Sequence, residues 1–201
     1  MSSTVRDKII QAALDRFHAL GFSACGVQEI VDRAGIPKGS FYNHFESKEQ
    51  LFQTASEEVL ERWGQMIDRA VAGISDPAEL FAVGIRISGR LGWTHPDIAG
   101  FLTGAGLAAL DVPGGLAPRA LRDIQAGQAA GRFTIPDAEI ALSAVAGGLL
   151  GLLRMRQRHP ERVDKEASVD QLAEAVLRLL GVPAPEAARL AVLPLPSTDV
   201  W

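Results

Sequence analysis

Apolar residues recur three or four positions apart along most of the chain, and no segment alternates apolar and polar residues as a half-buried strand does. In the first such segment the apolar positions are Val5, Ile9, Ala13, Phe17 and Leu20. Thr4 is placed to cap this helix, with Asp7 three residues later, and Gly21 follows as its stop. The pattern predicts an all-α protein.

Three more helices are expected in the first third of the chain. Two short ones cover Val27–Ala34, closed by Gly35, and Lys38–His44. The run Ser47-Lys48-Glu49-Gln50 has the form of a capping box, so a long fourth helix should begin there and end near Gly73.

The same periodicity continues to residue 180. Further helices are expected over about 77–92, 97–110, 116–130, 137–159 and 168–180. The proline-rich tail after Gly181 should hold only a short helix, which makes about nine to ten helices in all. We expect an N-terminal domain at 1–46 and a larger helical domain at 47–201, connected through the fourth helix without a flexible linker.

Composition limits the classes of function. The 201 residues carry a formal net charge of -4, so any binding of nucleic acid must come from a local surface. A single cysteine excludes a disulfide within the chain and fits a reducing cytoplasm. The most apolar stretch, Ile140–Leu153, is shorter than the ~20 residues that cross a bilayer. We expect a buried helix there, no secretory signal, no membrane contact and a cytoplasmic location.

The second and third helices have the features of a helix-turn-helix. Gly35-Ile36-Pro37 supplies a tight turn, and apolar residues on both sides can lock the two helices together. The third helix begins with a positively charged residue, a residue without a side chain and a hydroxyl residue, which are Lys38, Gly39 and Ser40. Tyr42 and His44 can donate to phosphates, and Asn43 can bond adenine. These residues predict a DNA-reading surface.

The run from Gln28 to Glu49 resembles the signature of the tetracycline-repressor (TetR) family, and the likeness extends over about residues 5–52. The resemblance implies a homodimer that binds double-stranded operator DNA, represses transcription and releases the DNA when a small-molecule effector binds. Carried over position by position, it implies DNA contacts by Gln28, Lys38, Gly39, Ser40, Tyr42, Asn43, His44 and Lys48. Lys48 opposes the dipole at the start of the fourth helix, which a phosphate partner would explain.

Two positions depart from the family pattern. Gly26 stands where the family often has Thr, and Pro37 replaces the usual Ser. Residues 1–50 also contain six basic and six acidic residues, so the DNA-reading unit is neutral. Its affinity should therefore depend on the placement of each charge and on pairing of two units in a dimer.

Large apolar side chains are spread over the helices that follow. The resemblance implies an effector pocket, for which the candidates are Trp63, Met66, Phe81, Ile85, Trp93, Phe101, Leu102, Leu107, Leu121 and Phe133. The alternative for each of them is ordinary hydrophobic core.

Small residues near Gly147 and Gly151 indicate close helix packing, which fits a dimer interface of two helices from each subunit. The candidates for that interface are Leu149, Leu150, Leu153, Leu172, Val176 and Leu179. A core helix of a monomer is the alternative.

Catalytic motifs are missing from the sequence. The four histidines are isolated, and no phosphate-binding loop, dinucleotide fingerprint or metal-ligand spacing occurs. We expect no enzyme activity, metal or cofactor. Two alternatives stay open: an activator, and a helical small-molecule-binding protein or enzyme whose helix-turn-helix is structural. Cys25 is interpreted as an apolar filler, with a redox sensor as its alternative.

Overall fold

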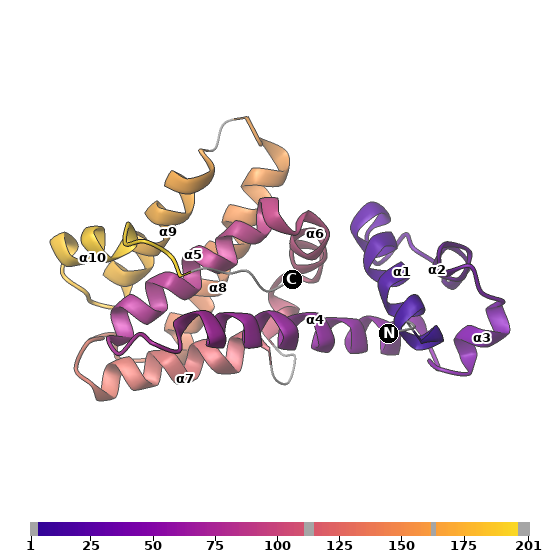
Figure 1. Ribbon diagram of the computed structural model, residues 1–201, viewed down its shortest axis with the longest axis horizontal. Helices are drawn as coiled ribbons and strands as arrows, with labels where there is room; N and C mark the ends of the chain where they lie inside the picture. The colour runs from indigo at the N-terminus through magenta and orange to yellow at the C-terminus, as the bar shows by residue number, and fades with distance from the viewer. Residues whose placement is uncertain (1–3, 111–114, 162–163, 197–201) are drawn as a thin grey trace.

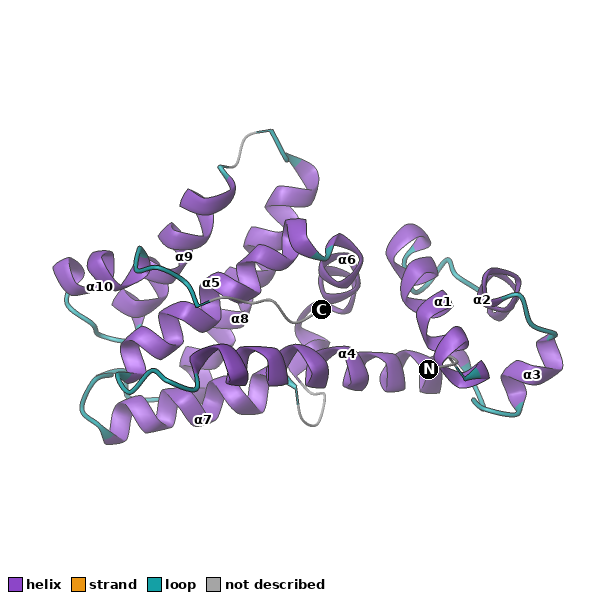
Figure 2. Ribbon diagram, in the orientation of Figure 1, coloured by secondary structure: helices purple, strands orange, loops and turns teal. Residues whose placement is uncertain are grey.

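The computed structural model describes residues 4–110, 115–161 and 164–196. Helices and connecting loops make up these residues, as the hydrophobic pattern predicts (Figure 2). The molecule is elongated, with α1, α2 and α3 at one end and α5 to α10 at the other (Figure 1). Helix α4 (Lys48–Val71) runs between the two ends.

The N-terminal unit consists of α1 (Val5–Leu20), α2 (Val27–Ala34) and α3 (Lys38–Tyr42). The predicted capping box at the start of α1 is present, because the Thr4 hydroxyl accepts from the Asp7 amide and the Asp7 carboxylate accepts from the Thr4 amide. Helix α3 ends two residues earlier than predicted.

Helix α4 begins where the sequence predicts, although its cap differs in one bond. Ser47 Oγ accepts from the Gln50 amide at 3.1 Å, as expected. Gln50 Oε1 accepts from the amide of Glu46 at 2.6 Å, one residue before the cap that a regular capping box would use. The loop from α3 is thereby tied to the first turn of α4.

The C-terminal part contains six α-helices and a short 3₁₀ helix within the described residues. They are α5 (Pro77–Thr94), α6 (Pro96–Ala105), the 3₁₀ helix Gly106–Leu110, α7 (Leu116–Ala129), α8 (Ala138–Arg158), α9 (Lys165–Leu179) and α10 (Ala184–Ala191).

Two of the predicted helix boundaries in this part are wrong. The single helix expected over 97–110 breaks at Gly106, whose φ of 61° lies in the left-handed region and cannot continue an α-helix. Helix α9 starts at Lys165 and not at Ser168, because Asp164 caps it by accepting from the Ala167 amide at 2.7 Å.

Helix α5 lies at the centre of the C-terminal part and contacts α7, α8 and α9. It approaches α9 closely at Gly89, where a Cβ would lie 2.6 Å from Val169 Cγ1. Three residues before Gly89, α5 is further tied to α9 by an ion pair between Arg86 and Asp170, with 2.6 Å between Nε and Oδ1.

The N-terminal unit packs against the C-terminal part through α6 as well as through α4. One continuous hydrophobic cluster extends from α1 to Leu153 of α8. The ring of Phe52 on α4 lies 5.5 Å from that of Phe17 on α1 and 5.0 Å from that of Phe101 on α6. At Gly100 of α6, a Cβ would lie 1.9 Å from His18 Nδ1. A larger residue at position 100 would therefore push α1 away from α6.

Helix α8 departs from the prediction of a buried helix. It has 21 residues, and its most apolar stretch has a mean hydropathy of 1.5, so by length and composition alone it could cross a membrane. Only 22% of that stretch is buried. Its outward side carries small residues at Ala144, Gly147 and Gly151, while Ile140 is 65% exposed. This apolar face has no cover among the described residues of the chain.

Candidate nucleic-acid interface and ligand cavity

Helices α2 and α3 form the helix-turn-helix that the sequence predicts. Gly35 ends α2 with φ 66° and ψ 39°, the left-handed conformation that glycine adopts without strain. Ile30 of α2 and Phe41 of α3 have no exposed surface, so the pair is locked by burial. Pro37 precedes α3 in an extended conformation and provides no side-chain cap.

Helix α3, which contains four of the eight residues predicted to contact DNA, lies at the outer end of the molecule (Figure 1). Lys38, Gly39, Asn43 and His44 are exposed, and Ser40 is half-buried. Tyr42 is 54% exposed, with its ring edge-on to the buried Phe41 ring at 5.2 Å.

Gln28 is also exposed, on α2, where its Nε2 donates to Asp32 Oδ1 at 2.8 Å. The geometry leaves all eight predicted contacts as predictions, because no DNA is present.

Lys48 occupies a more internal place than a phosphate-binding residue needs. Its Nζ donates to the carbonyl oxygens of Phe22 at 2.9 Å and of Cys25 at 3.0 Å. The ammonium also lies 4.2 Å from the centre of the Phe22 ring. These contacts explain a cation in the first turn of α4 without a phosphate, and they fix the turn between α1 and α2.

Cys25 lies in that same turn and is buried, with 1% of its surface exposed. Burial raises the pKa of its thiol, and the charge of Glu29 adds to the effect. A thiol with a raised pKa is a poor nucleophile at neutral pH, which agrees with the interpretation as an apolar filler.

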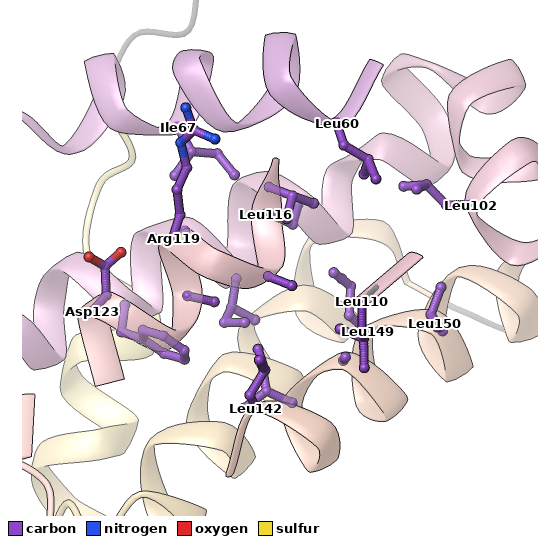
Figure 3. Close-up of a pocket in the computed structure, with 18 of the residues that line it drawn as sticks. Leu60, Ile67, Leu102, Leu110, Leu116, Arg119, Asp123, Leu142, Leu149 and Leu150 are labelled. Carbon is purple, nitrogen blue, oxygen red and sulfur yellow. The ribbon is translucent and has the colours of Figure 1, made fainter. Parts of the chain in front are cut away.

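A cavity of about 120 Å³ lies in the C-terminal part (Figure 3). Its wall is mainly leucine and other aliphatic side chains from α4, α5, α6, the 3₁₀ helix, α7 and α8. The labelled leucines in Figure 3 are Leu60, Leu102, Leu110, Leu116, Leu142, Leu149 and Leu150. Three charged residues, Asp68, Arg119 and Asp123, also line it.

Arg119 links two helices at the charged side of the cavity. Figure 3 shows its side chain running from α7 to α4. Its Nε donates to Asp68 Oδ2 at 2.7 Å, and its two Nη atoms donate to the Glu61 carboxylate at 2.9 and 3.0 Å. Hydrogen bonds from Arg119, Gln65 and the Gly115 amide lower the pKa of Glu61 from 4.5 to about 2.

Asp123 is the second carboxylate of the cavity wall. Burial raises the pKa of its carboxyl, and Arg122, whose Nε donates to Oδ1 at 2.9 Å, opposes that rise. Together the two arginines and the three carboxylates of this cluster, Glu61, Asp68 and Asp123, carry one net negative charge. An anion is therefore the least suitable occupant, whereas a neutral hydrogen-bond donor finds acceptors.

Three of the ten residues predicted to line an effector pocket line this cavity: Phe81, Ile85 and Leu102. The other seven do not: Trp63, Met66, Trp93, Phe101, Leu107, Leu121 and Phe133.

The reason lies in which neighbour each side chain faces. Phe101 belongs to the aromatic cluster with Phe52, and Trp93 lies 4.4 Å beneath the Arg156 guanidinium. Phe133 packs edge-on against Phe81 at 5.9 Å, while Leu107 is 58% exposed.

The remaining three are likewise placed elsewhere. Trp63 and Met66 are buried on α4 without lining the cavity, and the Trp63 ring lies edge-on to that of His95 at 5.8 Å. Leu121 is half-buried on α7. The charged residues of the cavity, in turn, were absent from the sequence-based candidates, because isolated charges on helices resemble solvated ones.

The predicted dimer-interface residues also separate into two groups. Leu149, Leu150 and Leu153 line the cavity, so they face the interior of the chain. Val176 is buried and Leu172 is half-buried in a separate hydrophobic cluster of the C-terminal part, which also contains Phe81 and Ile124. Leu179 alone is exposed, at 44%. The outward face of α8 is formed by the small residues between these leucines.

Comparison with known proteins identifies the family. The model described as "Bacterial regulatory proteins, tetR family" matches residues 9–55, and "Tetracyclin repressor-like, C-terminal domain" matches residues 76–192, more than half of the chain. The chain belongs to the TetR family of DNA-binding transcriptional regulators. The expectation of a regulator without enzyme activity is thereby confirmed.

Among solved structures, the TetR-type chain is similar to RolR crystallised with the ligand resorcinol. The two share 33% sequence identity and a TM-score of 0.78, over 97% of this chain and 96% of that one. RolR without ligand gives 32% identity and a TM-score of 0.75, over 96% of this chain and 99% of that one.

Curated relatives match a shorter stretch of the chain. The transcriptional repressor KstR2 of Mycolicibacterium smegmatis is 36% identical over 80 residues, which is 38% of this chain and 39% of that protein. The regulator LmrA of Bacillus subtilis is 40% identical over 75 residues, which is 37% of this chain and 40% of that protein. The matches span about two fifths of these relatives.

Proposed function

We propose that this protein is a homodimeric transcriptional repressor, acting in the cytoplasm, that leaves its operator when a small hydroxylated aromatic compound enters the cavity. One observation carries the proposal: α4 supplies cavity residues Leu60, Ile67 and Asp68 and also continues into the DNA-reading unit. A ligand that changes the position of α4 therefore changes the spacing of two reading units in a dimer.

The proposed DNA contacts rest on exposure and chemistry. Lys38, Tyr42 and His44 are exposed on or directly after α3, and each can donate to a phosphate. Gly39 has no atom within 4 Å of the position its Cβ would take, so the backbone is open to close approach by DNA. Asn43 is exposed directly after α3, and an asparagine amide can bond the edge of adenine.

The proposed dimer uses the uncovered face of α8 together with α9. Ala144, Gly147 and Gly151 leave that face flat, and Ile140, Met155 and Leu179 are exposed large apolar residues on the two helices. A second copy of the chain would cover a surface that is costly to leave in water. Small residues on α8 would let the two copies of the helix approach closely.

The proposed effector class follows from the size and chemistry of the cavity. An apolar cavity of roughly 150 Å³ can hold benzene, so a volume of about 120 Å³ suits a single small ring. Asp68 and Asp123 supply hydrogen-bond acceptors on one side only. Resorcinol, the ligand in the similar RolR structure, combines one ring with two hydroxyl donors. The net negative charge of the surrounding cluster disfavours carboxylate ligands.

The DNA-binding part of the proposal is tested by a mobility-shift assay with a duplex of the DNA flanking its own gene. We expect two chains to bind one duplex, and Tyr42→Ala to weaken that binding. The control is Gln125→Ala, because Gln125 is exposed on α7 in the C-terminal part and not in the DNA-reading unit. This variant should bind as the wild type does. Equal binding by Tyr42→Ala and wild type would favour a structural helix-turn-helix.

The effector part is tested by calorimetric titration with a matched series of single-ring compounds. Resorcinol should bind more tightly than benzene, because Asp68 and Asp123 accept its hydroxyl hydrogens, and more tightly than benzoate, because the charged cluster repels an anion. Asp123→Asn should reduce the preference for resorcinol over benzene. Tighter binding of benzoate than of resorcinol would contradict the proposed class.

A further inference from the structure

Helix α4 bears three residues on one face that together hold Arg119. Glu61, Gly64 and Asp68 are spaced i, i+3 and i+7, which places them along one side of a helix. The Arg119 side chain lies across Gly64, since a Cβ there would be 2.8 Å from Nη1 and 2.9 Å from Cδ and Cζ. A carboxylate stands on each side of this gap, and both accept from the same guanidinium.

The start of α7 is fixed by the same group of atoms. The Gly115 amide donates to Glu61 Oε2 at 3.3 Å, and Arg119 Nη1 donates to the Gly115 carbonyl at 2.7 Å. Three hydrogen bonds from Arg119 and one from the Gly115 amide thus connect α7 and its cap to α4. A fourth bond from Arg119 connects it to the Gly115 carbonyl. We call this arrangement the Arg119 clamp.

The clamp shares two of its residues with the cavity wall. Asp68 and Arg119 line the cavity, whereas Glu61 lies outside it and 42% of its side chain is exposed. A ligand hydroxyl that donates to Asp68 competes with Arg119 for the same carboxylate oxygens. Glu61 then becomes the remaining anchor of Arg119 on α4.

We propose that the Arg119 clamp couples the cavity to the DNA-reading unit, with Glu61 as a positioning residue that acts through Arg119. The inference rests on the proposed function, because it requires an effector in the cavity and an operator at α3. An effector that bonds Asp68 exchanges one of the α4–α7 ion pairs for a ligand contact. The position of α4 against α7 then differs between the two states, and α4 carries the reading unit.

The clamp must be loosened without replacing a residue that lines the cavity, and neither Glu61 nor Gly64 lines it. Glu61→Gln removes the charge that holds both Nη atoms and keeps the shape of the side chain. Gly64→Ala displaces the guanidinium by steric contact and keeps every charge, while alanine in a helix interior is favoured over glycine by about 1 kcal/mol. A fold defect is therefore not expected from Gly64→Ala. Glu57→Gln is the control, because Glu57 accepts from Gln53 of its own helix and takes no part in the clamp.

The experiment measures operator affinity with and without saturating resorcinol, by fluorescence anisotropy on the duplex flanking the gene, and resorcinol affinity by calorimetry. In the wild type and in Glu57→Gln, we expect resorcinol to weaken operator binding by a factor within the roughly 5–150-fold range typical of allosteric coupling. In Glu61→Gln and Gly64→Ala the factor should fall below about threefold, while resorcinol still binds.

The outcomes separate the clamp from the proposed function. Wild-type coupling that persists in either clamp variant overturns the role of the clamp and leaves the effector-released repressor intact. Loss of resorcinol binding together with coupling in both variants also overturns it, because the clamp would then be part of the binding site. A wild type whose operator affinity resorcinol leaves unchanged contradicts the proposed function, and the clamp role with it.

Discussion

The Lys48 ammonium lies 4.2 Å from the centre of the Phe22 ring and donates to the Phe22 carbonyl at 2.9 Å. The ammonium also donates to the Cys25 carbonyl, so one charged group bonds two residues of the turn between α1 and α2. The first turn of α4 is thus bonded to the turn between α1 and α2. Lys48 stabilises the reading unit whether or not it also touches a phosphate.

Lys48→Met should lower the free energy of unfolding by about 1.5–3 kcal/mol, the range for hydrogen bonds to a charged group. Two part-buried carbonyl oxygens would lose their donor, and the methionine side chain cannot replace it. Urea denaturation followed by circular dichroism measures the change. Lys38→Met, at an exposed position, is the control and should leave the stability unchanged. Equal stability of the two variants would show that the Lys48 contacts contribute little.

Lys38→Gln should instead change the salt dependence of operator binding. An exposed lysine that neutralises one phosphate in each subunit removes about two counterion contacts from the dimer when it is replaced. The slope of log K against log salt should become less negative by about 1.8. Anisotropy titrations at several salt concentrations measure it. An unchanged slope would mean that Lys38 does not touch a phosphate.

The ion pair between Glu61 and Arg119 should lose its contribution to stability in acid, between pH 4.5 and about 2. The pKa of Glu61 is lowered from 4.5 to about 2 in the folded chain, so its contribution is complete above pH 4.5 and is lost as the pH falls toward 2. The difference in unfolding free energy between wild type and Glu61→Gln should therefore shrink over that range. Denaturant titrations from pH 6 downward measure it, and a difference that does not change with pH would contradict the shift.

A charge on the outward face of α8 should dissociate the dimer. Gly147→Glu places a carboxylate where nothing lies within 4 Å in the single chain, so the fold tolerates it, but two copies of the helix could no longer approach. Sedimentation velocity should shift from twice the chain mass to the chain mass. Ala129→Glu, at an exposed position on α7, should remain dimeric. A dimeric Gly147→Glu variant would move the interface elsewhere.

The N-terminal unit could be predicted from sequence because its signals are local. Thr4 and Asp7 form a capping box within one turn, and Gly35 takes the left-handed conformation that its place after α2 requires. Such features depend on neighbours in the chain and not on the tertiary structure. The long helices could be located for the same reason, and the errors at Gly106 and Lys165 concern their ends.

The cavity could not be predicted, because periodicity shows that one side of a helix is buried and not what it is buried against. On α8, Leu149 and Leu150 were expected at a dimer interface and line the cavity. Aromatic residues were favoured as lining, whereas Phe101 completes a cluster with Phe52 between the two parts of the chain. The clamp is harder still to foresee, since Arg119 and Glu61 are 58 positions apart.

The central claim is that the effector and the operator each weaken the binding of the other to this protein. Its most direct measurement is the affinity for resorcinol of the free protein and of the operator-bound protein, beside the operator affinity with and without resorcinol. We expect both affinities to fall by the same factor, because binding linkage is reciprocal. Tight binding of resorcinol with an unchanged operator affinity would contradict the account.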